Sequence, residues 1–304
     1  MNKIIPLVSV LIPTFRREEK VIKCLLSVVE QDYPKEKVEV VVFDDNSGEE
    51  HVKKLETFVN KIKDKGFVRV ELIKSEVNVG LVKARNFLAK RIGENSNFIF
   101  FLDDDVYLRE DVLNVLVEYM LKDERVGIIG PKIVYYTKPD KVFISTRFVG
   151  KFTGKYYCED TEEILECDVI EPGCMLLRRE VIERLNGFSE EFVRSHEGVD
   201  FCLRARKLGY KVVYNPNIVV EHDIELNPPS SKRLYYTYRN KIFIMKRHLP
   251  WYGKIISLVG VVFFAFPKYI VSSILRHKRV VFEELWIIIK AVYDGIMGLS
   301  GRRV

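Results

Sequence analysis

The chain contains few cysteines and a single glutamine. Its five cysteines include no CxxC pair and are odd in number, so they give no sign of a disulfide framework. We interpret them as reduced, mostly buried thiols of a protein from a reducing compartment. Gln31 stands alone among abundant Lys, Glu, Val and Ile, a composition that hints at a thermophilic source. Residues 1–12 reach a Pro-Thr turn at once and do not fit a signal peptide.

A strong charge of one sign is also missing, because the net charge is only +6. No aromatic–basic alternation or nucleic-acid motif is present, so we expect no nucleic-acid partner. The basic residues gather late in the chain, at 246–248, 276–279 and 302–303, near apolar stretches. Such clusters suit an anionic membrane surface. With 304 residues, 47% hydrophobic and 30% charged, the chain is predicted to form one large or two fused globular units.

Apolar runs alternate with helical spacings over the first hundred residues. The predicted strands are 8–12, 38–43, 68–73 and 98–102, and the predicted helices are 18–30, 52–62 and 81–91. This alternation predicts an α/β fold with a Rossmann-like, doubly wound, mostly parallel sheet. Past residue 126 the pattern loosens. There we predict strands at 127–129, 141–144, 211–214 and 218–220, and helices at 179–185 and 199–208.

In the first half of the chain, three predicted strands (8–12, 38–43 and 98–102) are each followed by a polar motif at the carboxyl end. The motifs begin at Pro13, at Asp44 and at Asp103, and they should meet at one edge of a parallel sheet, where nucleotide pockets form. Three adjacent carboxylates repel one another and require a counter-charge. Because residues i and i+2 of an extended segment point the same way, Asp103 and Asp105 can close on one divalent cation. A solvated acidic turn is the alternative.

A boundary is predicted at 227–231, where Asn-Pro-Pro-Ser-Ser excludes a helix. We therefore expect a domain over 1–227, with a nucleotide-binding half 1–105 and an acceptor half 106–227, and a helical region over 228–304. Residues 255–275 would just span a bilayer, but Pro267 and Lys268 interrupt them and favour re-entrant or in-plane helices. Residues 282–299 form a second, amphipathic stretch. We predict membrane-associating helices that lie in the interface, with an oligomerisation tail as the alternative.

Taken in order, several motifs resemble those of the family 2 glycosyltransferases. They are residues 8–15 (VSVLIPTF), 43–47 (FDDNS), 78–86 (NVGLVKARN), 101–105 (FLDDD), 173–180, 186–188, 197–210 and 221–222. The resemblance covers about residues 5–225 and suggests the rhamnosyltransferase-like type that builds bacterial and archaeal surface glycans. It implies the GT-A fold and an inverting transfer from a nucleoside-diphosphate sugar that depends on Mn²⁺ or Mg²⁺.

The resemblance also implies roles for single residues. Those implied to contact the donor are Pro13, Thr14, Asp44, Asn78, Gly80, Arg85, Asp103 and Asp104. Those implied to hold the metal are Asp105, Asp103 and His222. Structural alternatives stay open for several of them. Asp44 and Asp45 also suit an Asx-type turn after a strand, Arg85 suits a solvated helix position, and His222 suits a packing role.

One motif departs from the family pattern. The usual acceptor-base motif Glu-Asp-x-Asp reads Glu197-Gly198-Val199-Asp200, so the carboxylate normally assigned as base is absent. Direct displacement requires proton removal from a hydroxyl acceptor. Glu197 or Asp200 takes that role, or the acceptor is an already anionic lipid phosphate, or the protein binds its donor without efficient catalysis. We favour the first explanation, with Glu197 as proton acceptor.

Together these patterns predict a metal-dependent inverting glycosyltransferase. Its expected acceptor is a glycan or a polyprenyl-(pyro)phosphate-linked glycan, and its expected place is the cytoplasmic face of the cell membrane, as a peripheral or monotopic protein. The alternative is a non-catalytic nucleotide-sugar-binding scaffold of a glycan assembly complex. The sequence carries no signal for an oligomeric state.

Overall fold

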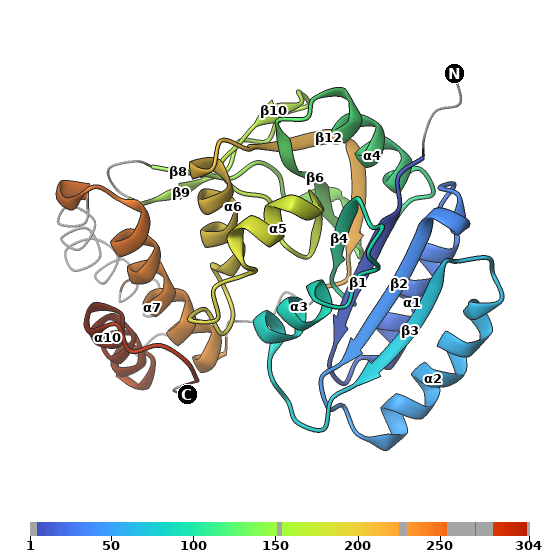
Figure 1. Ribbon diagram of the computed structural model, residues 1–304. Helices are drawn as coiled ribbons and strands as arrows, with labels where there is room; N and C mark the ends of the chain where they lie inside the picture. Colours follow the sequence, from blue (N-terminus) through green and yellow to red (C-terminus); the bar gives the residue numbers. More distant parts are fainter. Residues whose placement is uncertain (1–4, 151–153, 225–229, 254–270, 272–281, 303–304) are drawn as a thin grey trace.

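The computed structural model describes residues 5–150, 154–224, 230–253, 271 and 282–302 (Figure 1). The strands of the main sheet are β1 (Val8–Thr14), β2 (Val38–Asp44), β3 (Arg69–Lys74), β4 (Phe98–Leu102), β5 (Val106–Tyr107), β6 (Val126–Tyr135), β7 (Lys138–Ile144), β10 (Leu165–Glu166), β11 (Cys174–Arg178) and β12 (Lys211–His222). A separate hairpin consists of β8 (Phe148–Val149) and β9 (Tyr156–Tyr157).

The helices cover both faces of this sheet and extend beyond it at the C-terminal end (Figure 1). They are α1 (Glu18–Val29), α2 (Glu49–Lys63), α3 (Leu81–Ala89), α4 (Val112–Lys122), α5 (Arg179–Leu185), α6 (Glu197–Lys207), α7 (Ser231–His248) and α10 (Phe282–Met297), with a 3₁₀ turn at Lys35–Lys37. The predicted alternation of the first hundred residues is confirmed, with boundaries shifted by a few residues.

The sheet is mixed, and the prediction of a mostly parallel sheet is correct only for its first half. Its strand order is β10-β12-β6-β11-β4-β1-β2-β3, with β5 paired to β12 and β7 paired to β6. Strands β3, β2, β1 and β4 are mutually parallel, whereas β11 runs antiparallel to both β4 and β6. The amino end of β11 therefore lies beside the carboxyl end of β4, where Cys174 pairs with Leu102.

Several elements were absent from the sequence-based prediction, and two predicted strands are in fact one. The missed elements are helix α4, strand β11 and the two-residue strands β5, β8, β9 and β10. The strands expected at 211–214 and 218–220 form the continuous β12, whose pairing with β6 shifts between Asn215 and Val219. Pro216 lies in this irregular stretch, and proline has no N–H to donate to a ladder, which explains why the apolar pattern breaks there.

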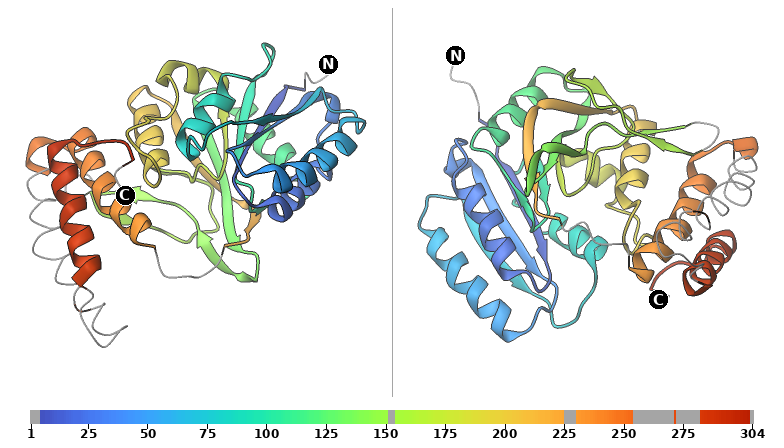
Figure 2. Two further views of the ribbon diagram at one scale, coloured as in Figure 1. Left: turned by 90° about the horizontal axis from the view of Figure 1, so that it is seen from below. Right: turned by 180° about the vertical axis from the view of Figure 1, so that it is seen from behind.

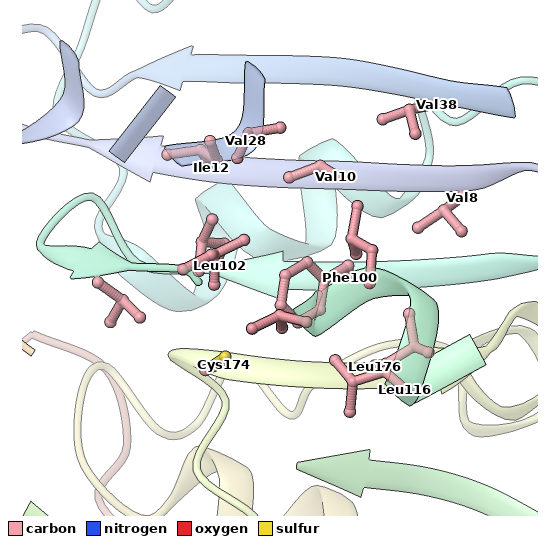
Figure 3. Packing of buried hydrophobic residues seen from close by; sticks show 14 of the residues in the cluster. Val8, Val10, Ile12, Val28, Val38, Phe100, Leu102, Leu116, Cys174 and Leu176 are labelled. Atoms are coloured by element: carbon pink, nitrogen blue, oxygen red, sulfur yellow. The ribbon is translucent and has the colours of Figure 1, made fainter. Parts of the chain in front are cut away.

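The core has two layers because the central strands are buried on both faces. On one face, Val8, Val10 and Ile12 of β1 pack with Phe100 of β4 and with helices α1, α2 and α4 (Figure 3). On the other face, Leu11 joins side chains of α3, α5 and α6. Four of the cysteines are buried within these layers as free thiols, which matches the expectation from their spacing.

The C-terminal helices pack on each other and on α6. Helix α10 lies along α7, to one side of the sheet (Figure 2), which confirms the helix expected within 282–299. Residues 227–229 of the boundary predicted at 227–231 and, apart from Val271, the apolar stretch 255–275 lie outside the described residues. Ser231, the last residue of that boundary, is the first residue of α7. In the part of the chain that is described, no helix is both long enough and apolar enough to span a bilayer.

Asp200 joins α6 to the end of α7. Its Oδ1 accepts hydrogen bonds from Arg247 Nη1 and His248 Nε2, both at 2.9 Å, and its Oδ2 accepts one from Arg204 Nε at 2.8 Å. The carboxylate is fully buried. Burial alone would raise its pKa, but the hydrogen bond from His248 and the Arg204 and Arg247 guanidinium groups lower the pKa to about 2.

We expect Asp200→Asn to lower the free energy of unfolding by about 3 kcal/mol at pH 7, because it removes a fully buried charge and leaves the part-buried guanidinium groups of Arg204 and Arg247 without their charge partner. Denaturant unfolding measures this, with the exposed Asp140→Asn as a control expected within about 0.5 kcal/mol of wild type. The difference should shrink as the pH falls below about 4, because the folded wild-type protein binds its proton at a lower pH than the unfolded chain does. An unchanged stability of Asp200→Asn contradicts the assignment.

Candidate active site

The polar motifs that follow β1, β2 and β4 meet at one edge of the sheet, as their positions predict. Thr14 Oγ1 donates a hydrogen bond to Asp104 Oδ2 at 2.7 Å, which joins the ends of β1 and β4. Asp45 N, just after β2, donates to Thr14 O at 2.9 Å. These strands are parallel and in register, so their carboxyl ends form a single row of polar side chains.

Arg17 supplies the counter-charge that the aspartate triplet requires. Its Nη1 lies 3.1 Å from Asp104 Oδ1 and 2.6 Å from Asp105 Oδ2. Burial raises the pKa of Asp104 to about 6, although the charge of Arg17 opposes that shift. The Arg17 side chain remains half exposed, so it covers the two acids from the solvent side. Sequence reasoning missed Arg17, whose only signal is its place just after the β1 motif.

Asp105 and His222 form a second pair, brought together by the pairing of β5 with β12. His222 Nε2 lies 3.1 Å from Asp105 Oδ1. Although burial opposes ionisation of Asp105, the hydrogen bond to His222 and the nearby positive charges lower its pKa. The other ring nitrogen, His222 Nδ1, is buried without a hydrogen-bond partner in the described chain.

These residues fit a divalent cation only in part. A carboxylate and an imidazole suit Mn²⁺, and Mg²⁺ is commonly held by one or two carboxylates together with substrate phosphates. Asp103, however, points to Arg85 and not to Asp105. Among the residues described, no three His, Cys, Asp or Glu side chains lie close enough to hold a metal ion together. Of the three expected metal ligands, Asp105 and His222 thus lie together, whereas Asp103 points to Arg85.

Arg85 is fully enclosed at the centre of the site. Its Nη2 lies 2.6 Å from Asp103 Oδ1 and its Nη1 lies 3.0 Å from Glu197 Oε1. The alternative of a solvated helix position is wrong, because the residue is only 1% exposed. Burial raises the pKa of Glu197, and the Arg85 charge opposes that rise. Glu197 Oε2 is buried and has no hydrogen-bond partner in the described chain.

The residues expected at the nucleoside also bind one another. Asp44 Oδ2 accepts from Ser47 N at 3.0 Å, the local turn that was the structural alternative for this residue. Asp45 accepts from Val79 N at 2.6 Å and from Gly80 N at 2.8 Å, and it also binds the Asn78 amide. The donor loop, defined as residues 78–80, is therefore held by Asp45. Sequence reasoning emphasised Asp44 instead.

The C-terminal end of the chain reaches this loop. Arg302 Nη2 donates to Asn78 Oδ1 at 2.8 Å. Arg239 of α7, itself buried, donates to Gly301 O at 2.7 Å and so fixes the segment that carries Arg302. No sequence motif indicated this contact.

The position of the absent base is closed. A Cβ atom added at Gly198 would overlap Cγ and Cδ of Pro172, so a proline ring fills the space where a longer side chain would begin. Asp200, one of the two predicted substitutes for the base, is fully buried under Arg204, Arg247 and His248, which hydrogen-bond to it, and offers no face to an acceptor. We therefore assign Asp200 to the α6–α7 junction.

Comparison with known proteins gives the site a family context. The model described as Glycosyl transferase family 2 matches residues 9–185, and the model described as Glycosyl transferase family group 2 matches residues 98–293. Glycosyltransferase AglE of Haloferax volcanii is 26% identical over 223 residues, which cover 73% of this chain and 68% of that protein.

A second relative and a solved structure extend the comparison. Dolichyl N-acetyl-alpha-D-glucosaminyl phosphate 3-beta-D-2,3-diacetamido-2,3-dideoxy-beta-D-glucuronosyltransferase of Methanococcus voltae is 27% identical over 236 residues, covering 70% of this chain and 65% of that protein. The mannosyltransferase PcManGT from Pyrobaculum calidifontis, solved in complex with GDP-Man and Mn²⁺, matches with a TM-score of 0.63 and 15% identity, over 98% of this chain and 89% of that one. This likeness establishes the GT-A fold.

The chain thus spans about two thirds of the length of these two curated relatives. The first family model covers more than half of its residues, including the acidic triplet and the ends of β1 and β2. The chain belongs to glycosyl transferase family 2.

Proposed function

We propose that this chain transfers a sugar from a nucleoside-diphosphate sugar to a glycan or lipid-linked glycan, with inversion and with the help of Mn²⁺ or Mg²⁺. The observation that carries the proposal is the row of acids at the carboxyl edge of β4, next to the Asp105–His222 pair. A fold neighbour crystallised with GDP-Man and Mn²⁺ supports it.

Each residue of the site has a task in this reaction. A bound divalent cation would neutralise the diphosphate and stabilise the charge of the departing nucleoside diphosphate, with Asp105 and His222 as its ligands. Arg17 bridges Asp104 and Asp105, so a cation held by Asp105 would replace one of its two contacts. Arg85 holds Asp103 in place for the donor ribose. Asp45 shapes the donor loop.

The lipid-linked acceptor is supported by the Methanococcus voltae relative, whose name specifies a dolichyl phosphate sugar as acceptor. Helix α10 adds a physical reason. One face of α10 packs on α7, and the other exposes a stripe made of Phe282, Trp286, Ile289, Tyr293 and Ile296. An apolar and aromatic stripe beside a polar body suits insertion into a membrane interface. This stripe supports a position at a membrane surface, and we propose the cytoplasmic face as that surface.

One specific observation favours the scaffold alternative. Residue 198, where the family carries its base, is a glycine, and Pro172 fills the space next to it. A scaffold binds the donor without turning it over. Release of nucleoside diphosphate from the donor therefore separates the two functions.

We expect Asp105→Asn to weaken Mn²⁺-dependent binding of UDP or GDP by at least about tenfold, because the substitution removes the charge of a metal ligand. Isothermal titration with and without MnCl₂ measures this. Asp111→Asn, an exposed substitution six positions along the chain, is the matched control and should bind as wild type does. Equal Mn²⁺ dependence of Asp105→Asn and wild type contradicts a metal site at Asp105.

We expect the double substitution Phe282→Ser/Trp286→Ser to reduce binding to anionic lipid vesicles by at least about tenfold, since each buried aromatic side chain contributes on the order of 1.5–3 kcal/mol. These residues are 76% and 67% exposed, so folding should be preserved. Vesicle co-sedimentation measures the effect. Val68→Ser/Val77→Ser, which removes exposed apolar side chains elsewhere, should bind normally. Full vesicle binding by the α10 variant would reject the membrane assignment.

A further inference from the structure

We propose that Glu171 is the catalytic base of the transfer, in place of the carboxylate that the family carries at the position of Gly198. This inference rests on the proposed function and concerns the same site. Neither the sequence motifs nor the family pattern indicated Glu171. It follows from the direction of β11, the packing of Pro172 and the accessibility of the carboxylates around Arg85.

The antiparallel course of β11 brings Glu171 to the catalytic edge. Residues 171–173 form the turn that enters β11, closed by a hydrogen bond from Cys174 N to Glu171 O at 3.2 Å. Gly173 O accepts from Asp103 N at 2.8 Å. A Cβ atom at Gly173 would lie only 2.5 Å from Asp103 Oδ2, so the backbone of this turn lies directly on that aspartate. Glu171 is therefore two residues from a direct contact with the acidic triplet.

The same turn closes the family's base position. Pro172 packs on the Cα of Gly198, and a side chain at 198 would overlap its ring. The residue immediately before this proline is Glu171. The turn thus leaves no room for a side chain at position 198, and it carries a carboxylate of its own one residue before the proline ring.

The side chain of Glu171 is more accessible to solvent than the two carboxylates of α6. A base must touch the acceptor hydroxyl, so an acceptor must be able to reach it. The side chain of Glu171 is 32% exposed, whereas that of Glu197 is 7% exposed and that of Asp200 is fully buried. Glu197 forms an ion pair with Arg85, and Asp200 forms an ion pair with Arg247 at the α6–α7 junction.

The charges around Glu171 fit this role. Arg147 Nη1 lies 3.3 Å from Glu171 Oε2 and orients the carboxylate. Burial and the Arg85 guanidinium have the largest effects on the pKa of Glu197, and the negative charge of Glu171 raises that pKa further. Glu171 is thus close enough to the central Arg85–Glu197 pair to act on it electrostatically.

The proposed step is a single displacement. As the acceptor O–H bond breaks, its proton passes to a carboxylate oxygen of Glu171, and the acceptor oxygen forms a bond to the anomeric carbon. The bond from that carbon to the donor phosphate oxygen breaks, and its electron pair leaves with the nucleoside diphosphate. With water as acceptor the same step yields the free sugar.

The test compares two nucleophiles in the full chain with Mn²⁺. UDP-N-acetylglucosamine and GDP-mannose are the donors, and release of nucleoside diphosphate is measured with water and with sodium azide. We expect Glu171→Ala to slow the water reaction by about 10²–10⁴-fold. Azide is an anion that needs no deprotonation, so it should restore turnover and give the glycosyl azide, detected by mass spectrometry. Glu171→Gln should behave in the same way, and the exposed Glu163→Ala should match wild type.

Three results overturn the inference. They are an unchanged water rate in Glu171→Ala, a slowed rate that azide does not restore although UDP or GDP still binds, and a loss in Glu197→Gln that azide restores. Failure of the proposed function has a different signature, namely a wild-type chain that neither binds nor hydrolyses either donor in Mn²⁺.

Discussion

The buried guanidinium of Arg85 is the interaction on which the site depends. It bonds to Asp103 at the end of β4 and to Glu197 at the start of α6, residues far apart in the sequence. Glu197 is buried and the guanidinium is fully enclosed, so each requires a charge partner, because an unpaired charge in this interior is costly. Asp103, whose side chain is 26% exposed, supplies the second carboxylate. This three-residue bridge joins the parallel half of the sheet to α6 in one geometry. It also explains why the Asp103 carboxylate points to Arg85 and not to Asp105.

The reversal of β11 brings its first residues to the edge of the sheet where the acids lie. A further parallel strand at this place would bring its amino end to the far edge of the sheet, away from the acids. The antiparallel strand begins at the catalytic edge and carries the turn of Glu171, Pro172 and Gly173 against Asp103 and Gly198. The absence of a side chain at Gly198 of α6 leaves the space that the ring of Pro172 occupies.

The sequence predicted the parallel half of the fold well, because its apolar runs are continuous and its helices are strongly periodic. It also predicted that Thr14, Asp44 and the acidic triplet meet, since all follow parallel strands. It predicted neither strand β11 nor its direction, because an apolar run as short as Cys-Met-Leu-Leu is a weak strand signal and carries no mark of orientation. The partners of Asp200 lie on α7, 47 and 48 residues further on, and local spacing contains no information about such contacts. The contacts of Arg17 with Asp104 and Asp105 were not predicted, because they depend on the conformation of the turn after β1.

The last described residues connect two distant surfaces. Arg302 bonds to the donor loop, and it follows α10, whose outward face is apolar. Because Arg239 holds this segment against α7, the position of the donor loop is linked to that of α10. Were α10 to adhere to a surface, its tilt would therefore set the angle at which the donor loop faces that surface. A substrate tethered to the same plane would then arrive from a fixed direction.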